Sequence, residues 1–288
     1  MGKLDHALSL DSELAAAVRI AHDAGKVIRD LRRSGIEARR KADESIVTQA
    51  DLDADALISR ELTRLYPSDA ILSEESGFKP GESGRTWVVD PLDGTSGYAS
   101  GGNDYAVQIG LLVDGRPLLG VVVEPESNRI YRALAGIGTF LSSALDGTMR
   151  QLKVSKKAVL SEMKLVTSSR ISSEVVRALG AHLGSELAGR THSVGVKVGR
   201  LARRDADLYF SAHPISYWDS CAPSVVLEAA GGMFTDLHGA PLSFDLDAPA
   251  HLHDSPLAAS NGHAHKEFCR EVRQFLSLDA NGDKSGPA

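Results

Sequence analysis

Two carboxylates on one turn, Asp90 and Asp93, are the part of the sequence best suited to chemistry. They follow the apolar run Trp87–Val89, which predicts a short buried strand ending at Asp90. Pro91 has no N–H and so interrupts ladder pairing. Gly94 then allows a tight turn in which the backbone approaches a ligand closely. Two carboxylates on such a turn can point into one pocket and bind a hard cation.

The backbone after this turn offers the donors that a phosphate needs. If a short helix begins here, the N–H groups of Gly94, Thr95 and Ser96 are free to face an anion. Oxygen ligands for a cation beside N–H donors for a phosphate suit metal-assisted phosphate hydrolysis. For two aspartates alone, a turn with solvated side chains is the commoner arrangement, so the interpretation depends on the rest of the chain.

Three further acids stand at the ends of predicted elements. Asp51 opens a helix, where an N-cap is the ordinary role and an acid aimed at an active site is the alternative. Glu74 is followed by Glu75, and adjacent carboxylates repel each other unless a cation or donors offset them. Asp219 opens another helix, whose dipole alone favours an acid there. Each acid therefore has a structural explanation beside a functional one.

Apolar periodicity predicts the elements that position these acids. We expect helices over 11–33, 51–66, 172–183, 218–230 and near the C-terminus, and a hairpin with strands 105–113 and 118–123. A basic helix with Lys197, Arg200, Arg203 and Arg204 is expected after the strand at 191–195. Further strands are expected at 46–50, 71–72, 129–134, 139–141, 163–167, 191–195, 207–211, 234–237, 242–244 and 257–260. We predict an α/β (α+β) fold with sheets between helix layers, halves at 1–150 and 151–278, and a disordered tail at 279–288.

Composition excludes several classes of protein. The 288 residues, 42% of them hydrophobic, can bury a sizeable core. A net charge of −6 argues against a nucleic-acid polymer as partner, and no run of about 18 apolar residues indicates a membrane span. We expect Cys221 and Cys269 to be reduced and, since the N-terminus is unlike a signal peptide, a cytoplasmic location.

Four segments stand in an order typical of one superfamily. They are Ile46–Asp51, Leu72–Ser76, Trp87–Thr95, and Trp218–Asp219 with Ala229–Gly232. Together they resemble the inositol monophosphatase superfamily of Mg²⁺-dependent, lithium-sensitive phosphatases, over nearly the whole chain. The resemblance implies the layered αβαβα sandwich of the inositol monophosphatase and fructose bisphosphatase type. Most metal ligands would come from the first half.

The resemblance also implies the parts of an active site. Two or three Mg²⁺ ions, which activate water and stabilise the leaving oxygen, would be held by Glu74, Asp90, Asp93, Asp219 and the Leu92 carbonyl. Asp51 would accept a hydrogen bond from Thr95 and so orient it towards the attacking water; with Glu74 these are the expected catalytic residues. The phosphate would be bound by Asp93, Gly94, Thr95 and Ser96.

Two stretches resemble the 3′(2′),5′-bisphosphate nucleotidase branch most, namely Gly94–Tyr98 and Asp219–Pro223 with Gly231–Gly239. Those enzymes remove the 3′-phosphate of adenosine 3′,5′-bisphosphate, a by-product of sulfate activation and sulfotransfer. Ser96 stands where that branch usually has Lys, a departure that bears on the substrate and not on the reaction type. Selectivity is expected from the second half, through Lys197, Ser168, Arg170 and His192. A solvated helix position is an equal alternative for Lys197.

Two other hypotheses remain beside this one. Inositol 1-monophosphate or another sugar phosphate is the alternative substrate. A non-catalytic binding member of the fold is the alternative from a different class, and it is disfavoured because every acid position is filled. On each enzymatic hypothesis the partner is a small-molecule phosphate ester, and the protein is a monomer or a homodimer.

Overall fold

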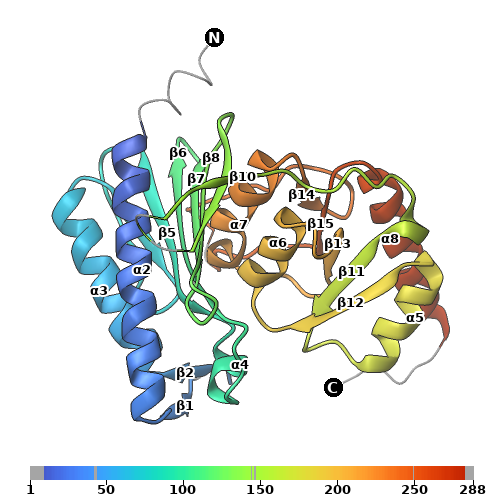
Figure 1. Cartoon of the computed structure of the whole chain (residues 1–288), viewed down its shortest axis with the longest axis horizontal. Coiled ribbons are helices and arrows are strands. Elements are labelled where there is room, and N and C mark those ends of the chain that lie inside the picture. The colour runs from blue at the N-terminus through green and yellow to red at the C-terminus, as the bar shows by residue number, and fades with distance from the viewer. Residues whose placement is uncertain (1–9, 42–43, 144, 146, 249, 283–288) are drawn as a thin grey trace.

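Two β-sheets lie between three layers of helices (Figure 1). The computed structural model describes residues 10–41, 44–143, 145, 147–248 and 250–282. One sheet has eight strands and the other five, and a separate two-stranded sheet lies beside the first helix layer. The predicted αβαβα sandwich is confirmed.

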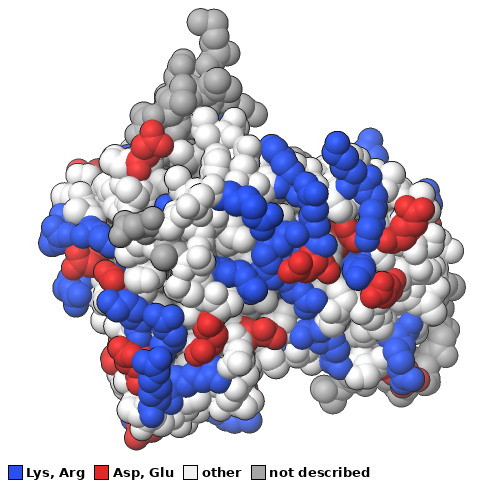
Figure 2. Space-filling view, in the orientation of Figure 1, with Lys and Arg blue, Asp and Glu red and all other residues white. Residues whose placement is uncertain are grey.

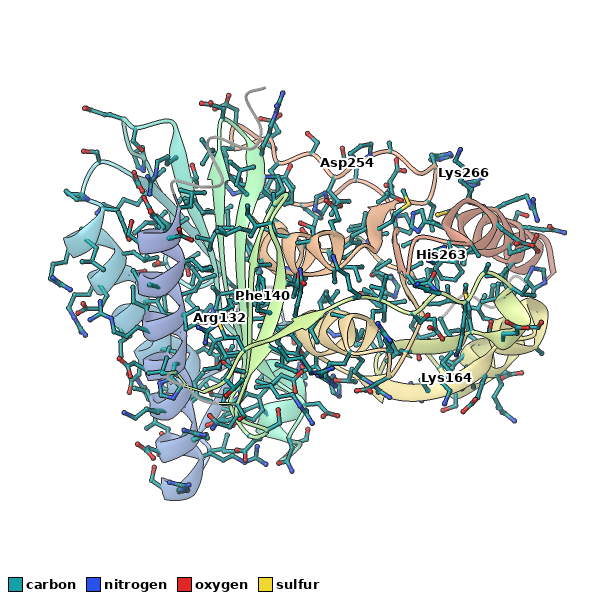
Figure 3. The ribbon with its side chains drawn as sticks, turned by 45° about the horizontal axis from the view of Figure 1, so that its top comes forward. Arg132, Phe140, Lys164, Asp254, His263 and Lys266 are labelled. Atoms are coloured by element: carbon teal, nitrogen blue, oxygen red, sulfur yellow. The ribbon has the colours of Figure 1, made fainter. Side chains whose placement is uncertain are left out.

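The first half supplies the larger sheet. Its strands are β3 (Ala70–Ser73), β4 (Gly77–Lys79), β5 (Arg85–Asp93), β6 (Ala106–Val113), β7 (Arg116–Glu124), β8 (Arg129–Leu134), β9 (Gly138–Ser142) and β10 (Arg150–Leu152). They are ordered β10-β9-β8-β7-β6-β5-β3-β4, and only β3 and β5 pair in parallel. The two-stranded sheet consists of β1 (Ala38–Arg40) and β2 (Ile46–Thr48). Arg132 on β8 and Phe140 on β9 lie side by side where these strands pair (Figure 3).

The second half supplies the smaller sheet. Its strands are β11 (Lys164–Ser168), β12 (Glu186–Thr191), β13 (Leu208–Ser211), β14 (Met233–Asp236) and β15 (Leu257–Ser260), in the order β12-β11-β13-β15-β14. The helices are α2 (Asp11–Ser34), α3 (Gln49–Leu65), α4 (Thr95–Ala99), α5 (Ser173–Leu183), α6 (Val194–Ala202), α7 (Tyr217–Ala229) and α8 (His265–Gly282), with a short 3₁₀ turn at Leu160–Glu162.

Helices α2 and α3 cover the outer face of the larger sheet (Figure 1). In α2, Ala17, Ala21, Ala24 and Ile28 recur at helical spacing and are fully buried, so one stripe of the helix packs against the strands. The helix predicted over 11–33 is therefore confirmed. Helices α5 and α8 cover the far face of the smaller sheet (Figure 1).

Helices α6 and α7 form the layer between the two sheets (Figure 1). A β-carbon at Gly110 of β6 would lie 2.5 Å from the Cys221 sulfur of α7. Glycine at this position therefore allows the helix to pack directly on the strand. This close packing fixes the first turn of α7 relative to β5 and β6. Both cysteines, Cys221 and Cys269, are free and buried.

Strand β5 continues through Pro91, although the sequence predicts its end at Asp90. The pairing with β6 shifts between Asp90, opposite Gln108, and Asp93, opposite Ala106. Pro91 lies in this bulge, so its missing N–H leaves no ladder hydrogen bond unmade. The bulge turns the backbone just where the two acids stand.

Two predicted strands are wrong. Residues 191–195 are divided between the end of β12 and the start of α6, with Ser193 as N-cap. Residues 242–244 form no strand; Pro241 makes only an isolated bridge to Thr235. No strand was predicted over 77–79, where the structure has the edge strand β4.

The disordered tail predicted at 279–288 overlaps the last helix of the structure. Helix α8 continues to Gly282, so 279–282 are helical where a disordered tail was expected. Residues 283–288 lie outside the described part of the chain. The boundary near residue 150 stays a prediction, and β10 pairs with β9 of the larger sheet. None of the helices in the described ranges has the length and apolar character needed to cross a membrane.

Basic side chains gather over β10 and α6 on the face shown in Figure 2. Part of this charge is neutralised by ion pairs: Arg203 lies 2.8 Å from Glu124 and 2.9 Å from Asp205. Glu124 belongs to β7 and Arg203 follows α6, so this pair connects the first half of the chain to the second. This ion pair attaches the C-terminal end of α6 to the larger sheet.

Candidate active site

A cavity of about 270 Å³ is lined by residues of both halves. The predicted site residues that line it are Glu74, Asp90, Leu92, Asp93, Gly94, Thr95 and Ser96 from the first half and Ser168, Arg170, His192, Lys197 and Asp219 from the second. Asp51 is the one predicted residue that does not, and it lies directly behind Thr95. The structure thus brings the whole predicted set together.

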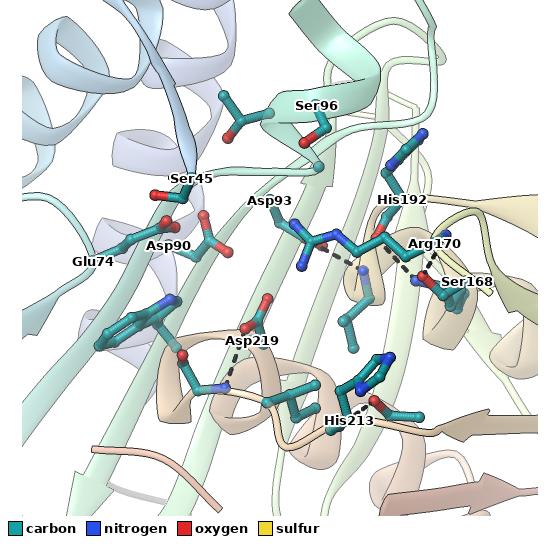
Figure 4. Close-up of a pocket in the computed structure, with 18 of the residues that line it drawn as sticks. Ser45, Glu74, Asp90, Asp93, Ser96, Ser168, Arg170, His192, His213 and Asp219 are labelled. Carbon is teal, nitrogen blue, oxygen red and sulfur yellow. Dashed lines mark hydrogen bonds between the residues drawn. The ribbon is translucent and has the colours of Figure 1, made fainter. Parts of the chain in front are cut away.

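Three aspartates form the acidic wall of this cavity (Figure 4). Asp90 and Asp93 flank the bulge in β5, and Asp219 stands in the first turn of α7, where it accepts from the Ser216 N–H at 3.2 Å. Each offers a carboxylate oxygen within 4.8 Å of the other two. The set of three includes no histidine or cysteine, and oxygen donors of this kind suit Mg²⁺.

The acidic wall needs a cation to be stable when ionised. Burial, followed by the charges of Glu74 and Asp93, raises the pKa of Asp90 well above its usual range. Burial and the charge of Asp93 raise the pKa of Asp219 to about 7. The pKa of Asp93 is also raised by burial, although Lys197 and hydrogen bonds oppose the shift. A divalent cation would offset this repulsion, so the residues present fit a metal site.

Glu74 points into the same cavity beside Asp90 (Figure 4), but it also faces a cation of the chain. The Lys41 ammonium lies 3.5 Å from Glu74 and 2.6 Å from Glu75. Burial and the charge of Asp219 raise the pKa of Glu74 to about 8, and Lys41 opposes that shift. Lys41 thus supplies the charge that the adjacent Glu74 and Glu75 require.

The Leu92 carbonyl is held within the bulge. The Leu92 N–H donates to Asp90 Oδ1 at 3.0 Å, and the Leu92 oxygen lies 2.9 Å from the Thr95 hydroxyl. Leu92 itself is fully buried. The apolar side chain therefore fixes the backbone while its carbonyl stays beside the acids.

Asp51 and Thr95 are joined by a hydrogen bond of 2.8 Å. The other Asp51 oxygen accepts from the Thr48 N–H at 2.7 Å and the Thr48 hydroxyl at 2.6 Å. Burial raises the pKa of Asp51, and the hydrogen bonds from Thr48 and Thr95 oppose this. Thr48, and not Asp51, is the N-cap of α3, so the N-cap interpretation of Asp51 is wrong. Asp51 is the third residue of the helix; one of its oxygens closes a capping box with Thr48 and the other accepts from Thr95.

Asp93 also caps α6. It accepts from the Ser193 hydroxyl, from the Val194 N–H at 3.0 Å and from the Gly195 N–H at 2.7 Å. These N–H groups belong to the first turn of the helix, where no intrahelical acceptor exists. A carboxylate there is further favoured by the helix dipole.

Lys197 is a buried residue of α6. Its side chain is 1% exposed, so the alternative of a solvated helix lysine is wrong. The ammonium donates to the His192 carbonyl at 2.9 Å and lies 5.2 Å from the centre of the Tyr209 ring. Burial lowers its pKa to about 8, against the attraction of Asp93 and Asp219. Lys197 is therefore a counter-charge beneath the acidic wall.

The opposite wall of the cavity carries the cationic side chain of Arg170 (Figure 4). Arg170 extends across it between Ser168 and His192, and its backbone N–H donates to the Ser168 hydroxyl at 3.2 Å. No ion pair or hydrogen bond of the Arg170 guanidinium occurs within the described ranges. Burial and the charges of Arg170 and Lys197 lower the pKa of His192.

Several lining residues were missed by the sequence reasoning. They are Ser45, Ile46, Ile171, Val194, Tyr209, the loop 211–216 and Trp218. The loop contains Pro214 and immediately precedes Trp218–Asp219, a signal that could have marked it as a lining segment. The Ser193–Asp93 contact has no local signal, because it depends on how the two halves pack.

A cavity with carboxylate ligands on one wall and the Arg170 guanidinium on the other suits a metal-assisted reaction of an anionic ester. Residues 9–277 match the model of the inositol monophosphatase family. The chain therefore belongs to the inositol monophosphatase family and is a phosphatase of that family. The resemblance inferred from the sequence motifs is confirmed.

The relatives carry different names. The chain is 30% identical over 239 residues to the 3′(2′),5′-bisphosphate nucleotidase CysQ of Aggregatibacter actinomycetemcomitans, covering 81% of this chain and 87% of that protein. It is 31% identical over 270 residues to a histidinol-phosphatase of Streptomyces coelicolor, covering 92% and 97%. The solved inositol monophosphatase of Anabaena has a TM-score of 0.74 and 29% identity, over 94% of this chain and 99% of that one.

Proposed function

We propose that this protein is a Mg²⁺-dependent phosphomonoesterase that removes the 3′-phosphate of adenosine 3′,5′-bisphosphate to give AMP. The observation that carries the proposal is one cavity in which three aspartates, two buried and one partly buried, face an arginine without an ion-pair partner among the described residues. The acids suit metal ions at the phosphate to be cleaved, and the arginine suits a second anionic group of the substrate.

Mg²⁺ would be held by the carboxylates of Glu74, Asp90, Asp93 and Asp219 with the Leu92 carbonyl, as two or three ions. When bound, it would lower the pKa of water, polarise the phosphoryl group and neutralise charge on the leaving oxygen. Asp90 is best suited to metal binding as its main role, since within the described ranges its oxygens accept hydrogen bonds only from the Leu92 N–H and, at 3.4 Å, from the Gln108 side chain. The oxygens of Asp93 would both bind Mg²⁺ and accept hydrogen bonds from the first N–H groups of α6.

Asp51 and Thr95 would orient the attacking water. The Thr95 hydroxyl donates to Asp51 Oδ1, so its lone pairs are directed away from Asp51 and can accept a water proton. Asp51 is buried and its pKa is raised by burial, which makes it a better proton acceptor than an exposed aspartate. The proton lost by water would pass through Thr95 Oγ1 to Asp51 Oδ1.

The turn before α4 would hold the phosphate. Gly94 adopts φ 95°, a left-handed conformation that a residue with a β-carbon rarely takes. A β-carbon there would also lie 3.1 Å from the Asp104 carbonyl. On this proposal the turn would present the first N–H groups of α4, those of Thr95 and Ser96, to a phosphate in the cavity. The phosphate would also meet Gly94 and, through bound Mg²⁺, Asp93.

The cationic wall supports a substrate with a second anionic group. Arg170, Ser168 and His192 would contact that group or the nucleoside, and Lys197 would act through its charge because its ammonium is bonded to His192. The CysQ relative supports a bisphosphorylated nucleotide. Histidinol phosphate carries an ammonium group, which would meet Arg170 unfavourably. Inositol 1-phosphate stays the second candidate, supported by the Anabaena structure.

The direct test is phosphate release from adenosine 3′,5′-bisphosphate, inositol 1-phosphate and histidinol phosphate, each with Mg²⁺ and with or without lithium. The proposal predicts the highest kcat/KM for the bisphosphate and inhibition by lithium. A preference for inositol 1-phosphate would support the proposed reaction type and contradict the proposed substrate. No release from any ester by folded protein would favour a non-catalytic member of the fold. A cytoplasmic location and a monomer or homodimer complete the proposal.

A further inference from the structure

Arg32, in the last turn of α2, is bonded to the loop that follows α4. Its guanidinium donates to the carbonyls of Gly101 at 2.6 Å and Gly102 at 2.7 Å and to the Asn103 side-chain oxygen at 2.9 Å. This loop leads from α4 back to β6, and α4 lies beside the lower end of α2 (Figure 1). One side chain therefore makes three hydrogen bonds to successive residues of an otherwise exposed loop.

Two buried tyrosines surround the same guanidinium. Its central carbon lies 5.8 Å from the centre of the Tyr98 ring and 5.7 Å from that of Tyr105. The two rings pack edge to face, 5.0 Å apart. Tyr98 belongs to α4, and its hydroxyl donates to the Ile28 carbonyl of α2 at 3.0 Å. Arg32 thus lies where α2, α4 and the start of β6 meet.

The position of Arg32 is also fixed by charge. Glu126 lies 3.6 Å from the guanidinium and accepts from the Tyr105 hydroxyl at 2.8 Å. The Arg32 side chain is 19% exposed, so these interactions are partly protected from water. A planar fork of donors is required to meet three acceptors and two rings at once, and a lysine ammonium cannot reproduce it.

Apart from the buried Tyr98, which is bonded to α2, helix α4 has few features that would hold its position. It has only five residues, well below the length at which a helix is stable alone. Gly101 and Gly102 follow it, and glycine leaves the backbone free to move. Yet α4 begins with Thr95, whose hydroxyl must keep its 2.8 Å bond to Asp51.

We propose that Arg32 is a positioning residue for the phosphate site, which holds the loop 100–104 and through it keeps Thr95 and Ser96 of α4 in register with Asp51. The proposal rests on the proposed function for its effect on activity. Its structural part, the restraint of the loop, is independent of the substrate.

The chain offers a matched control on the same helix. Arg29 lies one turn before Arg32 and donates to the Pro125 carbonyl at 2.9 Å, away from α4. Arg29→Lys and Arg32→Lys therefore remove the same guanidinium from the same helix, but only the second change affects the loop after α4.

The experiment compares wild type, Arg32→Lys, Arg32→Ala and Arg29→Lys. It measures amide hydrogen exchange over 98–104, KM and kcat for the phosphate ester, and inhibition by inorganic phosphate, all with Mg²⁺. We expect Arg32→Lys to speed exchange of the loop and to raise KM and the phosphate Ki by about tenfold, which corresponds to about 1.4 kcal/mol of weaker phosphate binding. For Arg29→Lys, KM and the phosphate Ki should stay within about twofold of the wild-type values. Added guanidinium ion should partly restore the KM of Arg32→Ala.

Unchanged loop exchange and an unchanged phosphate Ki in folded Arg32→Lys would overturn the inference. An equal effect of Arg29→Lys would overturn it too, because the role would then belong to α2 in general. If wild type hydrolyses no ester, the proposed function fails, and the exchange measurement alone decides whether Arg32 restrains the loop. Arg32→Lys keeps the test valid should Arg32→Ala not fold.

Discussion

Asp93 accepts a hydrogen bond from the hydroxyl of Ser193, 100 residues later in the chain. The same carboxylate accepts from the first N–H groups of α6. The acid at the centre of the candidate metal site is therefore also the residue that caps a helix of the second half. Metal binding and the placement of α6 depend on one side chain.

Ser193→Ala tests this connection. Ser193 is the N-cap of α6 and accepts from the Val196 N–H at 2.9 Å, so its loss should lower the free energy of unfolding by about 1 kcal/mol. It should also lower kcat/KM, because Asp93 loses a donor that orients it. Denaturant unfolding and steady-state kinetics measure the two effects.

Ser172→Ala is the control for that change. Ser172 caps α5 by accepting from the Val175 N–H at 3.2 Å, and it does not line the cavity. The Ser172→Ala substitution should lower the free energy of unfolding by a similar amount and leave kcat/KM unchanged. If the two variants had the same activity, the link between Ser193 and the site would be rejected.

Asp51→Asn tests the proton path through Thr95. The amide can still accept hydrogen bonds, but it cannot hold the proton, so kcat should fall by roughly a hundredfold or more with little change in KM. Asp53→Asn is the control, since Asp53 is on the same helix, is exposed and accepts only from Gln49 at 2.6 Å. A kcat for Asp51→Asn close to that of Asp53→Asn would exclude the path.

The stability of the metal-free protein should fall as the pH rises. The pKa of Glu74 is raised to about 8 and that of Asp219 to about 7, from ordinary values of 4.5 and 3.8. Between those values the folded protein holds protons that the unfolded chain has lost, so this contribution is full at low pH and is lost as the pH rises through 7 and 8. The pKa of Lys197 is lowered to about 8, so its titration changes the stability only at higher pH than that of the two acids.

The measurement is the unfolding midpoint in chelator from about pH 5 to about pH 8, repeated with Mg²⁺. We expect the midpoint to fall in chelator and to fall less with Mg²⁺, which binds the ionised acids. A midpoint in chelator that rises over this interval would contradict the shifted pKa values.

Arg170→Ala tests the origin of selectivity. Removing the guanidinium should raise KM for the bisphosphate by about tenfold or more and that for inositol 1-phosphate by less than about twofold, because only the first substrate has a second phosphate. Arg177→Ala, on the exposed face of α5, is the control. Equal changes of KM for both substrates would remove Arg170 from this role.

The motif-bearing parts of the fold and site were predictable from sequence. Acids at strand ends and helix starts have local signals, and their order along the chain indicates one superfamily. The strands at 129–134 and 257–260 were predicted with their observed bounds. These segments have regular periodicity and clear turn residues on both sides.

The remaining parts depend on packing. Val194, Val196 and Val198 alternate as in a strand, yet they belong to α6, which lies between two sheets and is buried on nearly all sides. The sequence predicts a basic helix around Lys197, Arg200, Arg203 and Arg204, and the error lies in assigning its first turn to a strand over 191–195. The Ser193 cap on Asp93 and the Arg32 contacts to the loop after α4 join distant segments, so no local pattern predicts them.

The most direct test of the metal-assisted site is phosphate release by wild type and Asp90→Asn, each titrated with Mg²⁺ after removal of metal. Asp90 is 1% exposed, and among the described residues its carboxylate accepts hydrogen bonds from the Leu92 N–H and the Gln108 side chain, which the isosteric Asn can still accept with its amide oxygen. The change should therefore not unfold the protein. We predict Mg²⁺-dependent release by wild type and a loss of about a thousandfold in folded Asp90→Asn. Release that persists in chelator, or equal release by both proteins, would contradict the assignment.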